Sequence, residues 1–368
     1  MIDADELDAW LRLAHRPGLG RDAMRRLLAA FGSAQAVADA GPTALRAVVD
    51  AGVATAMTLA PEGHDARLAL TRAWLAAEPT RSVMTLGDAG YPAALLQTPD
   101  PPLILYLQGR AELLAMPSLA IVGSRNPTPQ GEDNARALAA HFSRAGWAVV
   151  SGLAAGIDGA AHEGALQGAG STLAVVGTGL DRVYPARHKA LAHRIAEAGL
   201  LVSEFPLETP PLAQHFPQRN RIIAGLARGT LVVEAALQSG SLITARLAAE
   251  YGREVFAVPG SIHSPQSRGS HALLREGAKL VESAADVLEE LGALRGQAVP
   301  ASPAIAPLST DAVDAVLTAL GHDPATLDTL MARCGWPPDR LNAHLLELEL
   351  SGQVARLPGG LFQRRTAA

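Results

Sequence analysis

The sequence predicts an α/β fold in which a doubly wound parallel sheet is flanked by two smaller domains. Between about residues 83 and 291, short uncharged apolar runs alternate with helical stretches, as in parallel strands covered by helices on both faces. The 368 residues are too many for one ordinary domain. The segments before and after this region are mainly helical in pattern. Residues 81–292 are therefore predicted to form a Rossmann-like domain.

Six strands and five helices are expected in the Rossmann-like domain. The expected strands cover residues 119–123, 147–151, 172–176, 200–203, 230–233 and 254–258. The expected helices cover residues 130–145, 157–167, 187–198, 220–227 and 243–251. In such a sheet the ligand crevice lies at the carboxyl ends of the strands. The residues that directly follow each strand are therefore the candidates for a binding site.

Residues 1–80 are expected to form a small helical domain. Apolar residues recur there at helical spacing, and Gly and Pro separate the short helices. The turn Arg16-Pro17-Gly18-Leu19-Gly20 lies between two of them and resembles the turns of helix-hairpin-helix and SAM-like modules. In such a turn, backbone amides at the start of the second helix can hold a phosphate. A plain tight turn explains the pattern equally well, so the sequence leaves both interpretations open.

The C-terminal part of the chain is predicted to be a winged-helix domain on a linker. Residues 293–308 are rich in Ala and Pro and nearly uncharged, which is typical of a linker. Residues 309–368 contain three amphipathic stretches, followed by two short strands around Pro358-Gly359-Gly360. Three helices followed by a hairpin is the winged-helix order. The pattern does not distinguish duplex DNA from protein as the target of this domain.

The charged residues exclude one large class of nucleotide-binding protein. Of the 31 cationic residues only Lys189 and Lys279 are lysines, and neither stands before Ser or Thr in a Gly-framed loop. The chain is therefore not expected to be a P-loop NTPase. Its formal net charge of -5 gives no general attraction to nucleic acid, so phosphate binding requires a local basic patch.

Other features favour a cytoplasmic protein. The single cysteine, Cys334, cannot form an internal disulfide, which fits a reducing compartment. No N-terminal signal pattern and no apolar run of about 18 residues occurs, so neither secretion nor a membrane span is expected. No cluster of carboxylates has metal-binding spacing. We expect no metal and no cofactor.

Two strand ends have the small residues that an anion site requires. Gly123-Ser124-Arg125 follows the first expected strand and combines close backbone approach, a hydroxyl and a guanidinium at a helix start. The turn after the second strand contains Gly152 and Gly156 and is also suited to phosphate. Asp158 in that turn would repel a phosphate, so it is expected to cap its helix instead.

The densest group of candidate residues is the segment 215–221. Phe216 offers a surface on which a base can stack, and the arginines on either side of Asn220, Arg219 and Arg221, offer charge for phosphate. Surface salt bridges are the alternative role for the two arginines. Lys189, after the third strand, is a further candidate, with a solvated helix start as its alternative.

Taken together, these motifs resemble those of the DNA-processing protein A family, DprA, also called Smf. The match runs in order over roughly residues 85–285. It rests on Gly123-Ser124-Arg125, the turn 151–158, Tyr184-Pro185, Ser203-Glu204-Phe205-Pro206, the segment 216–221, Ser239-Gly240-Ser241 and Val258-Pro259-Gly260. The resemblance implies a cytoplasmic homodimer that binds single-stranded DNA. It also implies protection of incoming strands and loading of the RecA recombinase during natural transformation.

The resemblance also implies roles for individual residues. The family's DNA-binding positions correspond here to Gly123, Ser124, Arg125, Gly152, Gly156, Lys189, Phe216, Arg219, Asn220 and Arg221. At the position before Lys189 the family often has Asn, whereas this chain has His188. The family's dimer surface implies an interface at Leu273 and Leu274, for which ordinary core leucines are the alternative.

Two other function classes are weighed against DNA binding. Gly229-Thr230 and Glu234 partly match the motif of nucleotide-hydrolysing enzymes of the lysine-decarboxylase-like (LOG) group. The Pro-Gly-Gly of that motif is replaced by Leu226-Ala227-Arg228, so the loop that would hold the sugar phosphate is absent. We therefore expect no enzyme activity and no catalytic residues. A protein adaptor without DNA binding is the second alternative.

Overall fold

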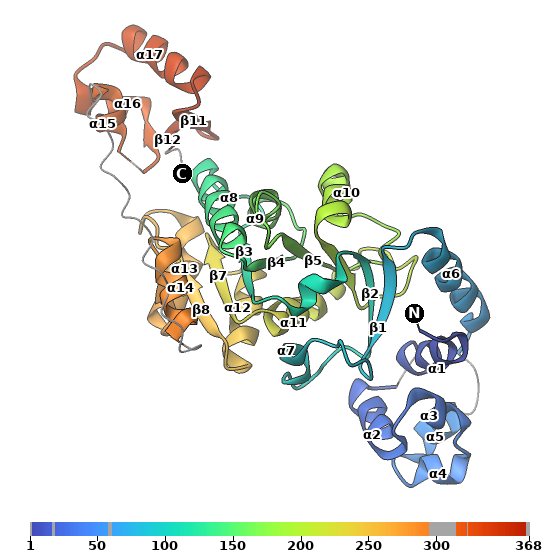
Figure 1. Ribbon diagram of the computed structural model, residues 1–368. Coiled ribbons are helices and arrows are strands. Elements are labelled where there is room, and N and C mark those ends of the chain that lie inside the picture. The colour runs from blue at the N-terminus through green and yellow to red at the C-terminus, as the bar shows by residue number, and fades with distance from the viewer. Residues whose placement is uncertain (1, 17–18, 58–60, 294–313, 322, 366–368) are drawn as a thin grey trace.

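The computed structural model describes residues 2–16, 19–57, 61–293, 314–321 and 323–365 (Figure 1). A nine-stranded sheet covered by helices lies between an N-terminal group of helices and a C-terminal domain with a three-stranded sheet. The predicted α/β class is confirmed. The expected linker, residues 293–308, lies outside the described residues from position 294 onward, and the exact domain boundaries stay predictions.

Six short helices form the N-terminal group. They are α1 (Ala4–Ala14), α2 (Arg21–Phe31), α3 (Ala34–Asp39), α4 (Pro42–Arg46), α5 (Ala51–Met57) and α6 (His64–Ala77). Leu27 of α2 is fully buried inside this group. Leu11 of α1 and Trp74 of α6 pack instead with side chains of the sheet. The N-terminal helices therefore share part of their core with the Rossmann-like domain.

The central sheet has the strand order β1-β2-β6-β5-β4-β3-β7-β8-β9. Its strands are β1 (Arg81–Thr85), β2 (Ile104–Gly109), β3 (Ser118–Gly123), β4 (Ala148–Ser151), β5 (Thr172–Val176), β6 (Leu200–Ser203), β7 (Gly229–Val233), β8 (Glu254–Ala257) and β9 (Lys279–Leu280). The six expected strands are β3 to β8, and they pair in parallel as predicted. The sequence reasoning missed β1, β2 and β9. Because β1 and β2 pair antiparallel at one edge, the sheet is mostly rather than wholly parallel.

Helices cover both faces of the sheet. The main ones are α8 (Pro129–Arg144), α9 (Ile157–Ala165), α10 (Lys189–Ala198), α11 (His215–Leu226), α12 (Ser241–Glu250), α13 (Arg268–Arg275) and α14 (Ala284–Ala293), and short helices span α7 (Ala93–Leu96), η1 (Ala111–Ala115), η2 (Ala186–His188) and η3 (Pro265–Ser267). Leu119 and Ile121 of β3 pack with α8, α9 and α14, whereas Ala120 and Val122 pack with α11, α12 and α13. Burial on both faces explains why the strands are uninterrupted apolar runs.

Helix α11 differs from its prediction in a way that affects the site. It was expected to open near Asn220 but begins at His215. Pro217 falls in the first turn, where its missing N–H is not needed and its fixed φ suits a helix. Arg219 and Arg221 therefore lie on one continuous helix, two residues and about 200° apart. Helix α10 likewise begins at Lys189, two residues later than expected.

The C-terminal domain has the predicted order of three helices and a hairpin. Its elements are α15 (Ala315–Leu320), β10 (Ala325–Thr326), α16 (Leu327–Cys334), α17 (Pro338–Leu350), β11 (Val354–Leu357) and β12 (Leu361–Arg364). The sheet order is β10-β12-β11, so the short strand β10 adds to the expected hairpin. Leu341, Leu345 and Leu348 of α17 form the centre of its core with Val316 and Leu330.

Candidate nucleic-acid interface

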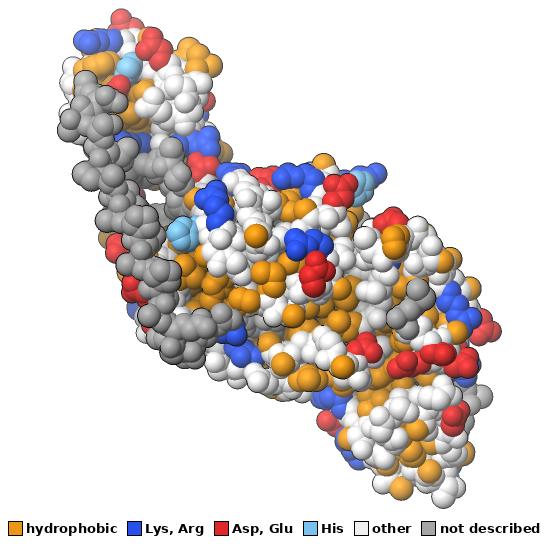
Figure 2. Space-filling model, in the orientation of Figure 1, with side chains coloured by type: hydrophobic (Ala, Val, Ile, Leu, Met, Phe, Trp, Pro, Cys, Tyr) orange, Lys and Arg blue, Asp and Glu red, His pale blue; other side chains and the backbone are white. Residues whose placement is uncertain are grey.

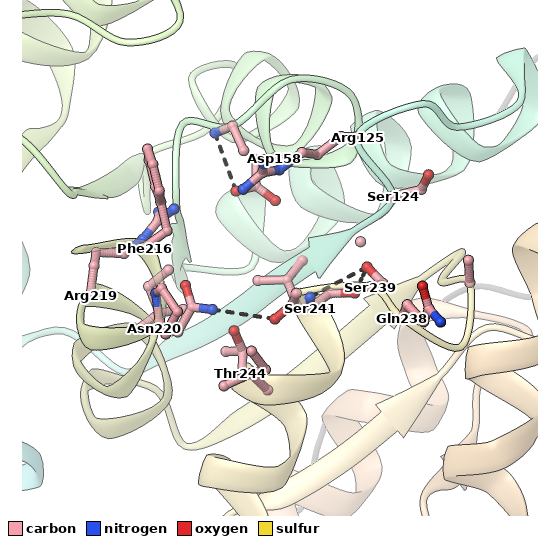
Figure 3. Close-up of a pocket in the computed structure, with 18 of the residues that line it drawn as sticks. Ser124, Arg125, Asp158, Phe216, Arg219, Asn220, Gln238, Ser239, Ser241 and Thr244 are labelled. Atoms are coloured by element: carbon pink, nitrogen blue, oxygen red, sulfur yellow. Dashed lines mark hydrogen bonds between the residues drawn. The ribbon is translucent and has the colours of Figure 1, made fainter. Parts of the chain in front are cut away.

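A pocket of roughly 730 Å³ opens at the carboxyl ends of the central strands (Figure 3). Most of its lining residues come from three segments: the β3–α8 loop, helix α11 and the β7–α12 turn at residues 238–241. Ser124 and Arg125 come from the first segment, and Phe216 and Arg219 come from the second. The pocket thus lies at the edge of the sheet that the strand-end rule indicates.

The end of strand β3 is shaped by contacts within the protein. A Cβ atom at Gly123 would lie 2.0 Å from the carbonyl oxygen of Val233, so glycine is required there by the neighbouring strand. From the sequence alone, close approach of a ligand is the expected reason for this glycine. The Ser124 hydroxyl accepts a hydrogen bond from Asn126 N (3.1 Å) and donates one to Gln266 Oε1 (3.2 Å). Both polar partners of Ser124 also line the pocket.

Arg125 is the exposed cation of the pocket. Its guanidinium lies over the ring of Phe216, with 5.6 Å from Cζ to the ring centroid. Phe216 in turn meets Tyr184 at a centroid distance of 5.6 Å and a tilt of 43°. Tyr184 is half exposed at the pocket rim. One cation and two aromatic rings therefore form a continuous strip that faces solvent.

Arg219 is the buried cation of the pocket. Only 4% of the residue is exposed, and its Nη1 donates a hydrogen bond of 2.8 Å to the carbonyl oxygen of Val175. Burial lowers the pKa of this guanidinium to about 10, which leaves it charged at neutral pH. A Cβ atom at Gly152 would lie 1.7 Å from Arg219 Nη1. Glycine at position 152 therefore provides the space that the buried guanidinium occupies.

Asp158 stabilises the β4–α9 turn and does not cap its helix as expected. Gly156 is the N-cap residue of α9, while Asp158 Oδ2 accepts hydrogen bonds from the amides of Gly152 (3.1 Å) and Ala154 (3.3 Å). Burial raises the pKa of the Asp158 carboxyl, and the nearby charge of Arg219 opposes that shift. The residue lines the pocket, so the positive field of Arg219 is partly balanced there.

Two histidines and a glycine hold the same turn in place. Gly156 has a φ of 76°, and a Cβ atom there would lie 2.4 Å from Ser124 O, so the turn packs tightly on the β3–α8 loop. The buried His162 ring accepts a hydrogen bond from Leu153 N through Nε2 (3.2 Å). His188 Nδ1 donates to Leu153 O (3.0 Å). His188, which stands where the resemblance often implies Asn, thus binds the turn through its ring.

Comparisons with known proteins agree with this fold. A family model described as DNA recombination-mediator protein A matches residues 82–292, and a DprA winged helix domain model matches residues 299–360. This chain belongs to the DprA/Smf family. It is 44% identical to the protein Smf of Escherichia coli over 301 residues, which cover 80% of each chain. It is 46% identical to DNA processing protein DprA of Bacillus subtilis over 57% of this chain and 71% of that one.

Two solved structures of the family resemble the DprA-family chain closely. The X-ray structure of DprA from Streptococcus pneumoniae aligns with a TM-score of 0.66 and 37% identity, covering 78% of this chain and 98% of that one. The structure from Helicobacter pylori aligns with a TM-score of 0.53 and 33% identity, covering 59% and 98%. The second is described as showing the single-stranded DNA binding mode of DNA processing protein A.

Four of the ten residues that the DprA resemblance assigned to DNA do not line the pocket: Gly152, Gly156, Lys189 and Arg221. Arg221 is directed away from it, because α11 turns its side chain to the opposite side from Arg219. Its guanidinium contacts the carbonyl oxygen of Asp100 and the carboxylate of Glu204. Lys189 is exposed at the start of α10, outside the pocket. For Arg221, the salt-bridge alternative describes what the structure shows.

Several polar pocket residues of the DprA-family chain were not among the predicted site residues. They are Asn126, Asp158, Gln238, Ser239, Ser241, Thr244 and Gln266. The turn 238–241 follows β7 after four intervening residues, and its Ser239-Gly240-Ser241 is one of the motifs on which the family resemblance rests. Its Ser239 and Ser241 hydroxyls lie 2.7 Å apart, and Asn220 Nδ2 donates to Gly240 O (3.3 Å). Gln266 comes from the short helix η3, which no sequence pattern connects with the pocket.

The two leucines predicted for a dimer interface differ in burial. Leu273 is 5% exposed and packs in the core between α13 and the sheet. Its burial favours the core alternative, because little of the side chain is available to a second chain. Leu274 is partly exposed beside it. The interface stays a prediction.

Glu234 has a structural partner in this DprA-family chain. Its carboxylate accepts hydrogen bonds from Thr128 N (2.8 Å) and Thr128 Oγ1 (2.5 Å) at the start of α8. A Cβ atom at Gly131 would lie 2.6 to 2.8 Å from that carboxylate. Glu234 therefore stabilises the first turn of α8 and does not line the pocket of Figure 3. Among the described residues, no cluster of three or more His, Cys, Asp or Glu could hold a metal, and no helix is long and apolar enough to cross a membrane.

Proposed function

We propose that this DprA-family chain is a non-catalytic mediator that binds single-stranded DNA in the pocket at the carboxyl ends of the strands. The observation that supports this most is the strip of Arg125, Phe216 and Tyr184 above the buried charge of Arg219. Cations bind the phosphates, and aromatic faces stack unpaired bases without sequence preference. The description of the H. pylori relative supports the same ligand.

The two pocket arginines have different roles in this proposal. Arg125 is exposed, so it contacts a phosphate directly and leaves the ring of Phe216 free for a base. Arg219 is held by Val175 and Gly152, so it supplies positive charge beneath the strand without moving. A base reaches Phe216 only when it is unpaired. We therefore expect single strands to bind more tightly than duplex DNA.

Family membership supports the later steps of the proposal. As a recombination mediator, the chain protects incoming single strands from nucleases, acts as a homodimer, and loads RecA onto the bound strand during natural transformation. These steps need no nucleotide hydrolysis by the chain itself. They are tested by adding RecA to a strand coated with the protein and following the growth of RecA filaments.

DNA binding is tested by fluorescence anisotropy of a labelled oligothymidine with the full chain. Arg125→Ala removes one charge-assisted contact, worth about 1.5 to 3 kcal/mol, so Kd should rise about 10-fold to 100-fold. Phe216→Ala removes a stacking surface of similar value. Arg125→Ala should also make the salt dependence less steep by about 0.7 in log–log slope.

Arg144→Ala is the matched control, because Arg144 is an exposed arginine at the far end of α8, where it contacts Gln167. This variant should bind the oligonucleotide like the parent. The proposed pocket is wrong if Arg125→Ala and Phe216→Ala also bind like the parent. A chain that binds no oligonucleotide at all supports the adaptor alternative instead.

A further inference from the structure

The third helix of the winged-helix domain, α17, is the element that a DNA-binding domain of this type places in the major groove. Entry into the groove requires exposed cations, because phosphates line both of its edges. The charges of α17 do not meet this requirement. It carries Asp339, Glu347 and Glu349 but only one cation, Arg340. Residues 309–368 as a whole contain five arginines and seven carboxylates.

The positive groups near α17 already have partners within the domain. The guanidinium of Arg340 stacks over the ring of Trp336, with Cζ 3.9 Å from the ring centroid. The His344 ring lies between the carboxylates of Asp314 (2.6 Å) and Glu347 (3.1 Å). On the wing, the guanidinium of Arg356 lies over the aromatic ring of Phe362 in the same hairpin. The outward face of α17 is therefore left with carboxylates.

Two large hydrophobic side chains project from the same face. Leu346 is 55% exposed and Leu350 is 81% exposed, and they stand four residues apart, which places them side by side on the helix. The buried leucines of α17 lie on its other side. Exposed leucines flanked by carboxylates have no use in a DNA groove but are typical of a protein-binding surface.

The winged-helix domain is also oriented so that this face is accessible. It contacts the Rossmann-like domain through Arg365, whose Nε and Nη2 donate to the Asp133 carboxylate of α8 (2.8 and 2.7 Å). Asp323 and Gln363 line the cavity between the two domains. Helix α17 lies on the opposite side, away from the sheet (Figure 1). In Figure 2, acidic and hydrophobic side chains lie at that end of the domain, together with basic side chains.

We propose that the outward face of α17 binds a basic amphipathic helix of another protein and does not bind duplex DNA. Leu346 and Leu350 would bury against the apolar stripe of the partner. Glu347, with its side chain 76% exposed, and Glu349 would pair with Lys or Arg side chains around that stripe. This surface is separate from the single-stranded DNA pocket, so the two can be occupied together.

The experiment measures binding of a labelled synthetic helix to the full chain by fluorescence anisotropy. The probe has Leu at positions i, i+3, i+4 and i+7 and Lys elsewhere, and a second probe has Glu in place of Lys. The Leu/Lys helix should bind and the Leu/Glu helix should not. Kd for the Leu/Lys helix should rise at least tenfold in the double variant Leu346→Ser, Leu350→Ser, and also in Glu347→Gln, Glu349→Gln.

The control variant is Leu96→Ser, which removes a leucine of similar exposure from α7 and should bind the helix like the parent. Thermal melting and oligothymidine binding should be unchanged in all variants, which shows that folding and the DNA pocket are intact. The proposal is overturned if the parent does not bind the Leu/Lys helix or if the double leucine variant binds it normally. Duplex DNA binding that is lost in the α17 variants would also overturn it.

Discussion

Arg219 and Arg221 are two residues apart on α11, and we predict that their alanine variants have opposite effects. Arg219→Ala should weaken binding of single-stranded DNA, because Arg219 lines the pocket. Arg221→Ala should leave that affinity unchanged and lower stability, because Arg221 is directed away from the pocket and pairs with Asp100 and Glu204. The pair is a matched comparison, since each variant removes one buried guanidinium from the same helix.

The expected loss of stability in Arg221→Ala follows from the ion cluster around it. The Arg221 side chain is 9% exposed and Glu204 is 13% exposed, and removal of one partner from a buried pair costs about 3 to 5 kcal/mol. Glu204 retains Arg21 at 3.2 Å, and Asp100 retains Arg21 at 3.0 Å and also Arg25. The remaining partners reduce the expected loss to about 2 to 3 kcal/mol. Tm should therefore fall by several degrees.

The assay combines thermal melting with oligothymidine anisotropy for both variants. Arg21 belongs to α2, so loss of Arg221 should also loosen the N-terminal helices and increase their proteolysis by trypsin. An Arg221→Ala variant that melts like the parent but loses DNA binding would contradict this role for Arg221. That result would mean that Arg221 turns into the pocket when DNA is bound.

Three further predictions concern the turns around the pocket. Gly152→Ala should raise the Kd for oligothymidine at least tenfold, because the added Cβ would displace the guanidinium of Arg219. An unchanged Kd would show that DNA binding does not need the Arg219 guanidinium in its observed place. Glu234→Gln should retain DNA binding, lose about 1 kcal/mol of unfolding free energy and therefore melt at a lower temperature. If the parent hydrolyses nucleoside monophosphates and this variant does not, the enzyme alternative is restored. Burial lowers the pKa of His162 to about 3, below its unfolded value near 6.5, so this group's contribution to stability is complete above pH 6.5 and declines as pH falls. The loss of stability between pH 7 and pH 5.5, measured by melting, should therefore be smaller by about 1 kcal/mol in His162→Gln than in the parent.

Much of the fold and part of the site were predictable because they depend on local patterns. Six strands were located within one residue, since a strand buried on both faces must be apolar throughout. Gly123, Ser124 and Arg125 were found because the carboxyl ends of parallel strands meet at one edge. The edge strands β1 and β2 were missed because antiparallel pairing at an edge does not require a continuous apolar run.

The sequence by itself determined the fold class, the family and the residue types of the pocket, since these depend on periodicity and on motifs along the chain. Only the tertiary structure decided which of two nearby arginines lines the pocket. The start of α11 at His215 sets the rotation of the helix, so Arg219 points to the pocket and Arg221 to Glu204. The tertiary structure also decided that Gly152 leaves space for the buried guanidinium of Arg219 and that Glu234 stabilises the start of α8. These roles arise from contacts between segments far apart in the chain, which no local pattern records.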